Sequence, residues 1–523
     1  MLQKRLTLIY NNKVLILLLG FLSFFINYHY GFIGMMPMDN TVLFNGGYRV
    51  VKGYKPFTDY WLVTGPILDY LNSFFFKTFG ISWKAFIFHS SIFNSIFALS
   101  SYFVLKKLGL SNLYSFIYSL FISVLFYPVV GTPFVDHHST FFMILAFYCL
   151  IFSLSPKNYN YLILIPSLLL FSFLSKQTPA AYGIIVISII VLIFILFEEK
   201  KRKEIFLKYT TGCLISLILF YFFFIITKIS ISDFFQQYIL FASSIGEDRL
   251  LNYSFSILNE VIKFKFISYY IFSLIFIFIF LKIKKSLTMN DLYILIISLS
   301  LTVILIFHQM ISFNQNFIFF LIPFLCGVLH SFCSKNFSKK YFLIISISIC
   351  LFSVTKYHIR FNEERKFNEL ENIDISKAVD AKIINDKLKG LKWITIIKPD
   401  NPEKELQNIL KVMNIFKKDS EKKMLITEYQ IISPLLDIYD NSPNQWHHPS
   451  VSFPLRGNKF FETYKNFFIT KIKKNKIVNI YETQENDDKI ITRLVLAENC
   501  FSKKRLGEML IKLKLNYNCK ELK

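Results

Sequence analysis

Long apolar runs separated by short polar segments occupy the chain from its amino end to about residue 355. A helix needs about 20 apolar residues to cross a bilayer, and eleven of these runs approach that length. We predict membrane spans at residues 14–33, 85–105, 113–130, 139–153, 161–174, 181–197, 209–227, 266–281, 292–307, 317–333 and 341–354. The runs that begin at residues 139, 161 and 341 are short. One pair of them could be re-entrant, which leaves the count open by about two spans.

Basic residues cluster in every second connection between these runs. These connections contain Lys106 and Lys107, Lys157, the run at 200–203, Lys282 with Lys284 and Lys285, and Lys335 with Lys339 and Lys340. Because short basic loops stay in the cytoplasm, the remaining connections are predicted to lie on the outer face, together with everything after residue 355. They comprise residues 34–84, 131–138, 175–179, 228–265 and 308–316.

After residue 355 the apolar runs shorten, and Lys, Glu, Asp and Asn become frequent. This change predicts a transmembrane domain at residues 1–354 and a soluble domain of ordinary size at residues 355–523. In the second domain we predict strands at 393–397, 423–427, 477–481 and 490–496, and helices at 374–388 and 402–416, the latter capped by Asn401. The predicted fold is an α-helical polytopic membrane domain of about eleven helices with a C-terminal extracytoplasmic α/β domain.

The composition agrees with this class. Of the 523 residues, 54% are hydrophobic and 18% are charged, and the mean hydropathy is +0.44. These values lie outside the range of soluble globular proteins, so the chain is an integral membrane protein. Many of the basic residues behind the net charge of +24 lie in the short clusters, and no basic stripe alternates with stacking aromatic residues. Nucleic-acid binding is therefore not expected. Heavy use of Phe, Ile, Lys and Asn is typical of an AT-rich genome and points to a bacterium.

Cys500 and Cys519 differ from the other five cysteines, which lie in apolar runs and act as small hydrophobic residues. They flank a predicted amphipathic helix at 502–512 and a returning strand at 513–518, whose rises nearly cancel. The two Cα atoms could then come within bridging distance. Outside the cytoplasm, a disulfide between them is favoured over free thiols.

Two acidic residues stand where the chain meets the predicted membrane surface. Asp39 follows the first span, and Asp136 precedes the fourth. A charge at the centre of a membrane helix costs about 2.5–3.5 kcal/mol, so acids this close to the hydrocarbon are candidates for a functional site. The alternative for Asp136 is a structural role, in which it accepts backbone N–H groups at the start of the span.

His137 and His138 follow Asp136 directly. Asp and His are common ligands of divalent cations, so Asp136 and His137 are candidate metal ligands. Two adjacent His residues cannot easily reach one metal from a helix, and the sequence leaves the metal requirement open. No other cofactor is predicted.

Further basic and polar side chains fall on the predicted outer face. This set contains Arg49, Lys55, Asp59, Lys176, Gln177, Arg249 and His308. Cations at this depth can neutralise an anionic headgroup that reaches the site from the bilayer. Alternatively, a lone Lys176 simply extends its ammonium group to the surface. Gln309 and the amides at 314–316 add donors and acceptors suited to sugar hydroxyls, with loop packing as the alternative.

A resemblance to a known family rests on three features of the chain. Asp39 leads into a loop that runs through Gly53-Tyr54-Lys55-Pro56-Phe57-Thr58-Asp59 to Gly65-Pro66, a second acid is Asp136, and the third feature is Leu174-Ser175-Lys176-Gln177-Thr178. Together they resemble the GT-C superfamily of membrane glycosyltransferases, especially the branch of protein O-mannosyltransferases and lipid A aminoarabinose transferases. Gln177 stands where the family has Gly.

The resemblance implies that a sugar moves, with inversion, from a polyprenyl-phosphate carrier to a glycan, lipid or protein acceptor on the outer face of a bacterial inner membrane. Asp39 would be the general base, and Lys176, Arg49 and Arg249 would hold the lipid phosphate. Asp136 and His137 would orient the acceptor or a cation. This chemistry needs a base for the incoming hydroxyl and cations for the departing phosphate.

Two other functions also fit apolar spans joined by outer loops. An O-antigen polymerase or ligase works on polyprenyl carriers but relies on a large outer loop rich in Arg and His. A transporter would place ionisable groups near the middle of the bilayer and would repeat its structure in two halves. In this chain the ionisable groups gather at one face and the halves do not match.

Overall fold

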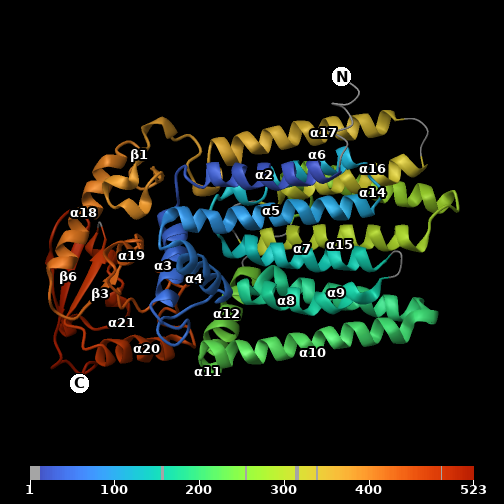
Figure 1. Cartoon of the computed structure of the whole chain (residues 1–523). Helices are drawn as coiled ribbons and strands as arrows, with labels where there is room; N and C mark the ends of the chain where they lie inside the picture. Colours follow the sequence, from blue (N-terminus) through green and yellow to red (C-terminus); the bar gives the residue numbers. More distant parts are fainter. Residues whose placement is uncertain are drawn as a thin grey trace. The chain divides into compact units, whose positions relative to one another are not determined.

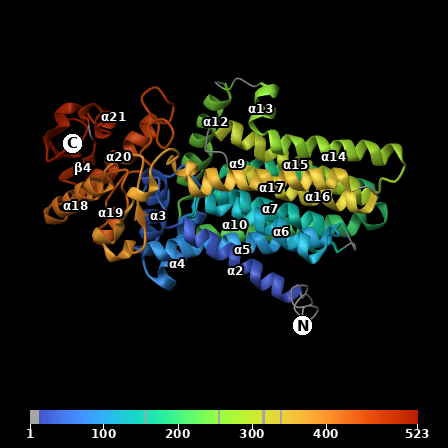
Figure 2. The ribbon, with the colours of Figure 1, turned by 90° about the horizontal axis from the view of Figure 1, so that it is seen from above.

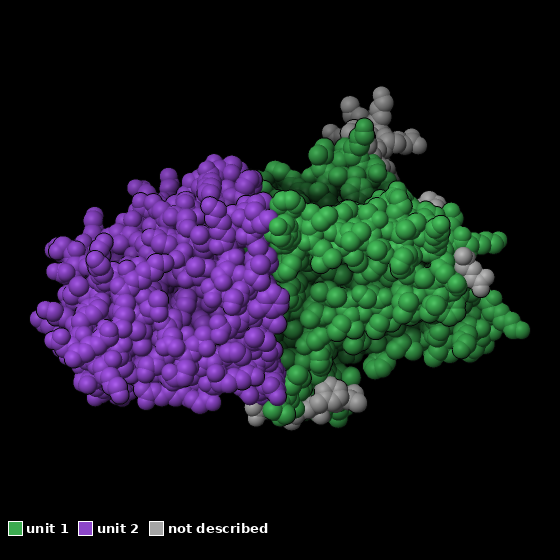
Figure 3. Space-filling view, turned by 90° about the horizontal axis from the view of Figure 1, so that it is seen from below, with its two compact units in different colours: residues 1–31, 87–223, 249–367 green, residues 32–86, 224–248, 368–523 purple. Residues whose placement is uncertain are grey.

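The structure, a computed structural model, describes residues 12–154, 158–251, 253, 256–312, 317–336, 340–484 and 486–523. The basic residues Lys157 and Lys339 and the polar segment 314–316 lie outside the described residues. Contacts divide the chain into two compact units, each assembled from three segments (Figure 3). Unit 1 contains residues 1–31, 87–223 and 249–367, and unit 2 contains residues 32–86, 224–248 and 368–523.

Unit 1 is a bundle of long apolar helices that run side by side (Figures 1 and 2). Within the described ranges, ten helices are long and apolar enough to cross a membrane. Seven of them are single helices: α2 (Asn12–Tyr30), α5 (Trp83–Lys107), α7 (Val135–Ser153), α9 (Gln177–Phe197), α10 (Arg202–Thr227), α14 (Lys265–Ile283) and α15 (Met289–Ser312). The other three are continued by a short helical turn: α6 (Asn112–Val124) extends through η2 to Val129, α16 (Leu321–Asn336) is preceded by η6 from Ile318, and α17 (Tyr341–His358) extends through η7 to Glu363. The eleventh predicted span corresponds to the shorter α8 (Leu164–Ser175). The predicted polytopic α-helical fold is confirmed.

Small polar side chains join the apolar helices around α2. The hydroxyl of Ser23 donates to that of Ser123 over 2.9 Å. The side-chain amide of Asn94 donates to the Ser23 carbonyl over 2.8 Å, and the Ser95 hydroxyl donates to the Gly20 carbonyl over 2.9 Å. Without a hydrophobic driving force between helices in lipid, such small residues permit close approach and supply hydrogen bonds. These contacts hold α2, α5 and α6 together.

Unit 2 contains a four-stranded mixed sheet with the order β3-β4-β6-β5. Its strands are β3 (Lys423–Ile426), β4 (Asn479–Thr483), β5 (Phe501–Arg505) and β6 (Leu510–Leu515). Strands β3 and β4 are parallel, and the other two pairs are antiparallel. Apolar side chains of the sheet, such as Ile480 and Ile511, share a core with Phe468 of α20 (Phe461–Lys474). The C-terminal part of the chain is therefore a small α/β fold, as predicted.

The long loop after α2 contributes helices of its own to unit 2. Helices α3 (Val42–Val51) and α4 (Ile67–Phe79) pack against each other. A Cβ atom at Gly46 would lie 2.1 Å from Oδ1 of Asp69, so only glycine permits this approach. The connection from α10 to α14 is also helical and contains α11 (Ile231–Phe234), η5 (Phe235–Phe241), α12 (Ala242–Leu251) and α13 (Ile257–Lys263).

The prediction of a helix at 374–388 is wrong. The segment forms three short 3-10 turns, at Ile375–Lys377, Ala381–Ile383 and Asp386–Leu388, around the two-residue strand β1 (Val379–Asp380). Side-chain oxygens of Asp374, Asp380 and Asn385 accept the backbone N–H two residues on. This local bond competes with helix formation. The strand predicted at 393–397 shrinks to β2 (Lys392–Trp393), which pairs with β1.

Two further predictions near the carboxyl end are wrong. The segment 490–496 contains the short helix α21 (Thr492–Val495) instead of a strand. The segment 502–512 is not a helix, because β5 and β6 form an antiparallel hairpin there. The apolar and basic residues alternate along β6 from Ile511 to Leu515, a pattern that suits a sheet with one exposed face.

The start of α18 and the bond between Cys500 and Cys519 agree with the prediction from sequence. Helix α18 (Pro402–Lys418) begins as predicted, and Oδ1 of Asn401 accepts the Lys404 N–H over 3.0 Å. The sulfur atoms of Cys500 and Cys519 are bonded, with 5.2 Å between their Cα atoms. The β5-β6 hairpin, rather than a helix followed by a strand, brings these two residues together.

Candidate active site

The candidate residues fall into two groups, one in each unit. Unit 1 contains Asp136, His137, Lys176, Gln177, Arg249 and His308. Unit 2 contains Asp39, Arg49, Lys55 and Asp59, together with Cys500 and Cys519.

In unit 1, Asp136 lies in the first turn of α7 and meets two groups from other helices. Lys176 Nζ lies 2.6 Å from Asp136 Oδ1, and His308 Nε2 lies 2.9 Å from the same oxygen. The side chains of Asp136 and His308 are each 1% exposed, and that of Lys176 is 16% exposed. A buried carboxylate is stable only when it is paired in this way. Three candidates from distant parts of the sequence therefore form one cluster.

The backbone around Lys176 is fixed by hydroxyl groups. Lys176 is extended and separates α8 from α9, which begins at Gln177. The Ser139 hydroxyl donates to the Lys176 carbonyl over 3.2 Å, and the Ser172 hydroxyl donates to the Ser139 carbonyl over 2.7 Å. The break between two helices thus presents an ammonium group to the first turn of α7.

Arg249 adds a second cation to this group. Its guanidinium donates to the Ser312 carbonyl, at the end of α15, over 3.1 Å. Burial lowers the pKa of Arg249, and the nearby charge of Asp136 opposes that shift. Two cations and an imidazole therefore surround one carboxylate. Such an excess of positive charge favours an anion such as a phosphate.

His137 has a different environment from Asp136. Its ring stacks on Phe317 at a centroid distance of 4.4 Å and also contacts the rings of Phe126 and Phe367. His138 contacts Nε2 of His89 over 3.0 Å. No group of three or more His, Cys, Asp or Glu side chains that could hold a metal occurs in the part of the chain that the structure describes.

In unit 2, Asp39 lies in a π-helical turn, Pro37–Thr41, and is half-buried. The indole N–H of Trp446 donates to Asp39 Oδ1 over 3.3 Å. The Asn40 side chain accepts the backbone N–H of Met36 over 2.8 Å and stabilises the turn. An acid on a short turn, oriented by an indole donor, has the form of a positioned proton acceptor.

Arg49 is fully buried in unit 2. Its NH2 group donates to both carboxylate oxygens of Asp440, over 2.9 and 3.1 Å, and NH1 donates to the Asn444 carbonyl. The guanidinium also lies 4.7 Å from the ring centre of Tyr60. These contacts engage both terminal nitrogens of the guanidinium and hold α3 to the C-terminal part of unit 2, so we give Arg49 a structural role.

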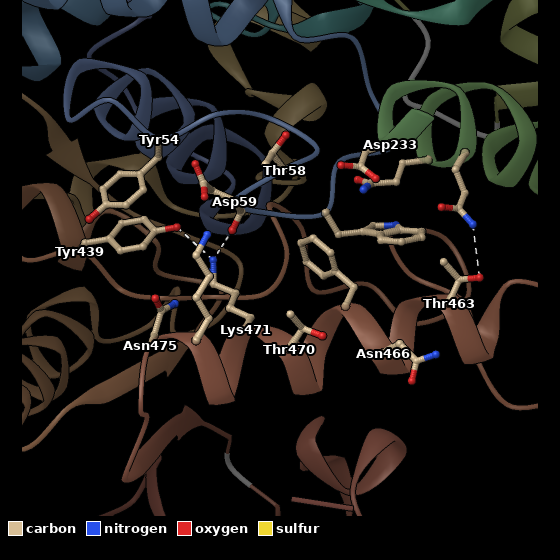
Figure 4. Close-up of a pocket in the computed structure, with 15 residues that line it drawn as sticks. Tyr54, Thr58, Asp59, Asp233, Tyr439, Thr463, Asn466, Thr470, Lys471 and Asn475 are labelled. Carbon is tan, nitrogen blue, oxygen red and sulfur yellow. Dashed lines mark hydrogen bonds between the residues drawn. The ribbon is translucent and has the colours of Figure 1, made fainter. Parts of the chain in front are cut away.

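Asp59 follows Lys55 in a tight turn, in which Asp59 Oδ2 accepts the Lys55 N–H over 2.9 Å. The backbone carbonyl of Asp59 accepts a hydrogen bond from Lys471 of α20, a residue that sequence reasoning missed. Burial lowers the pKa of Lys471 to about 7. Asp59 and Lys471 line a cavity of about 340 Å³ (Figure 4). Lys471 carries no local signal, because on sequence alone it is one of several lysines on an amphipathic helix.

Comparisons with known proteins give a likeness among solved structures only. No protein-family model and no curated protein matches the sequence. The chain is similar to ArnT from Cupriavidus metallidurans bound to undecaprenyl phosphate, with 9% identity, 96% of this chain and 97% of that chain covered, and a TM-score of 0.48. It is similar to the apo state of ArnT from the same organism, with 9% identity, the same coverage and a TM-score of 0.47.

Proposed function

We propose that this protein is a membrane glycosyltransferase that moves a sugar from a polyprenyl-phosphate carrier to a hydroxyl acceptor. The observation that carries the proposal is the cluster of Lys176, His308 and Arg249 around Asp136 in unit 1. It concentrates positive charge at the ends of membrane helices, where a lipid-linked phosphate would be held. Because the site is formed by membrane helices, it suits a phosphate attached to a lipid better than a water-soluble phosphate.

The roles of the residues follow from the bonds that change. The acceptor oxygen bonds to the anomeric carbon, and the bond from that carbon to the phosphate oxygen breaks. The polyprenyl phosphate leaves with the electron pair, and Lys176 and Arg249 stabilise its charge. Asp136 holds Lys176 and His308 in place. Asp39 takes the proton of the acceptor hydroxyl, and attack opposite the leaving group inverts the anomeric centre.

Lys55 and Gln177 are secondary candidates in this scheme. Lys55 lies in the turn closed by Asp59, and Gln177 begins α9 directly after Lys176. We propose that both contact the donor. We also propose that the reaction takes place on the outer face of a bacterial inner membrane, with residues 355–523 outside the cytoplasm. Basic residues in alternate short loops support that orientation.

The test separates donor binding from chemistry in the purified full-length protein in lipid nanodiscs. Asp39→Asn should lower the rate of sugar transfer by about 10²–10⁴-fold, the usual contribution of a general base, with donor binding unchanged. Lys176→Met should weaken binding of the polyprenyl phosphate by about 10–100-fold, since a charged hydrogen bond contributes about 1.5–3 kcal/mol.

Lys263→Met is the matched control, because Lys263 is an exposed lysine at the end of α13, and this variant should keep wild-type binding and transfer. Transfer at the wild-type rate by Asp39→Asn would refute the base assignment. Equal polyprenyl-phosphate binding by Lys176→Met and Lys263→Met would refute the phosphate site.

A further inference from the structure

The cavity of about 340 Å³ lies wholly within unit 2 and is distinct from the cluster of unit 1. It is bordered by α20, by the loop that contains Asp59 and by the segment that contains Asp233 (Figure 4). Its lining residues are Tyr54, Thr58, Asp59, Trp61, Asp233, Gln236, Gln237, Tyr439, Thr463, Asn466, Phe467, Thr470, Lys471, Lys474 and Asn475. Its volume is in the range of small-molecule sites.

Side-chain hydroxyls and amides supply most of the polar lining of this cavity. Thr470 and Asn466 are exposed along one face of α20, and Asn475 follows that helix (Figure 4). Gln236 donates its amide to the Thr463 hydroxyl over 3.3 Å. Groups of this kind both donate and accept hydrogen bonds, so they match the hydroxyl groups of a sugar.

The ionisable groups in the lining balance one another. The lining contains two lysines, Lys471 and Lys474, and two acids, Asp59 and Asp233. Lys471 is also engaged, because its ammonium group donates to the Asp59 carbonyl and, over 3.0 Å, to the Tyr439 hydroxyl. The lysines do not outnumber the acids, and burial lowers the pKa of Lys471 to about 7, so the lining has no net positive charge that would attract an anion. An uncharged polar ligand suits it best.

Aromatic rings complete the wall. Tyr54 and Tyr439 stack with their centroids 3.4 Å apart, and the rings of Trp61 and Phe467 lie 5.8 Å apart. Backbone bonds fix Trp61, since its N–H donates to the Pro443 carbonyl over 2.8 Å. The buried indole Nε1 of Trp61 has no hydrogen-bond partner among the residues that the structure describes. A buried donor that lines a cavity fits a ligand that brings an acceptor.

We propose that this cavity binds an uncharged sugar unit, and, on the basis of the proposed glycosyl transfer, that this unit belongs to the acceptor. Sugars combine apolar C–H faces with hydroxyls, and the cavity combines aromatic rings with amides, hydroxyls and a buried indole donor. The cations of the unit 1 cluster would hold the donor phosphate. The uncharged polar and aromatic groups of the cavity would hold the acceptor.

The direct test measures sugar binding to the purified full-length protein in nanodiscs by saturation-transfer NMR and titration calorimetry. The probes are methyl glycosides of glucose, galactose, mannose and N-acetylglucosamine, with methyl glucuronide as an anionic probe. We expect at least one uncharged glycoside to bind more tightly than the glucuronide. Thr470→Trp should fill the cavity and weaken that binding at least 10-fold, and Asn466→Ala should weaken it less.

Lys473→Trp is the matched control, because residue 473 is exposed on the same helix but does not line the cavity. It should bind sugar within twofold of wild type. Binding of no uncharged glycoside, tighter binding of the glucuronide, or equal binding by Thr470→Trp and Lys473→Trp would each overturn the sugar site.

Transfer kinetics distinguish this proposal from the proposed function. In a protein that transfers sugar, Thr470→Trp should raise the KM for the acceptor and leave the KM for the donor unchanged. Sugar binding without any transfer would refute the glycosyltransferase and its acceptor but support the sugar site. Transfer with an unchanged acceptor KM in Thr470→Trp would refute the acceptor assignment.

Discussion

Asp69 is buried in unit 2 between the Tyr60 hydroxyl and the Gln445 amide, at 2.7 and 2.9 Å. Burial raises its pKa from 3.8 to about 6, although both hydrogen bonds oppose the shift. A raised pKa means that the folded state binds the proton more tightly than the unfolded state. The stability that this proton provides is complete below pH 3.8 and is lost as the pH rises through about 6.

Asp69→Asn should remove this pH dependence. The amide keeps an acceptor for Gln445 and cannot ionise. As the pH rises from 4 to 8, the stability of the variant relative to wild type should increase by about 3 kcal/mol, because the pKa shift is about two units. The measurement is thermal unfolding of both proteins in detergent across that pH range.

Asp437→Asn provides a control of opposite sign, since the exposed Asp437 pairs with Lys52, which lowers its pKa. This variant should not gain stability relative to wild type as the pH rises. Parallel unfolding curves for wild type and Asp69→Asn would contradict the assignment of a buried, ionisable Asp69.

Among single residues, some members of the candidate site could be predicted from the sequence and others could not. Asp136 and Lys176 were recognisable one by one, because each charge interrupts apolar residues. Their contact was not, because it depends on how α7 packs against the junction of α8 and α9. The sequence shows only the charge of Arg49, which predicts a phosphate ligand. Its partner Asp440 is 391 residues away along the chain.

At the scale of elements, the membrane helices were predictable because each is a long apolar run that needs no information from elsewhere in the chain. The short elements of unit 2 were less predictable. The segment 490–496 is apolar enough for a strand, yet it turns into α21 because Glu482 of β4 accepts the backbone N–H groups of Ile491 and Thr492 over 2.7 and 2.9 Å. A side chain of the preceding strand, and not the apolar pattern of the segment itself, decides this element.

Replacement of Glu482 tests that explanation. Glu482 is fully buried, so Glu482→Leu would leave two backbone donors without their acceptor, at a cost of about 1–3 kcal/mol each. Amide hydrogen exchange measured by mass spectrometry should then accelerate at residues 490–496 and much less in α18. Glu482→Gln keeps an acceptor oxygen and should retain most of the protection. Equal exchange in Glu482→Leu and wild type would show that α21 forms without this cap.

At the scale of the whole molecule, the sequence predicts a change from a transmembrane to a soluble domain near residue 355, because the composition changes there. Periodicity could not predict that residues 32–86 and 224–248 would join residues 368–523 in unit 2. These associations arise from long-range contacts such as Arg49 with Asp440 and Trp61 with Pro443. The candidate acid Asp39 and the cavity proposed to bind a sugar both belong to this composite unit.

The orientation of the chain can be tested with its own cysteines. Cys500 and Cys519 are bonded in unit 2, whereas the five other cysteines, Cys149, Cys213, Cys326, Cys333 and Cys350, are free. A disulfide persists in an oxidising compartment and is rare in the cytosol. If residues 355–523 lie outside the cytoplasm, this pair should be oxidised in growing cells.

The experiment uses a variant in which the five free cysteines are replaced by Ala, followed by acid quenching of cells, denaturation and labelling with a polyethylene-glycol maleimide. We expect no mobility shift without reductant and a shift for two thiols after reduction. Lys107→Cys, in a loop predicted to be cytoplasmic, is the companion variant and should be labelled without reductant. Two reactive thiols at Cys500 and Cys519 before reduction would place unit 2 in the cytosol, where a polyprenyl-linked donor exposed on the outer face could not reach Asp39.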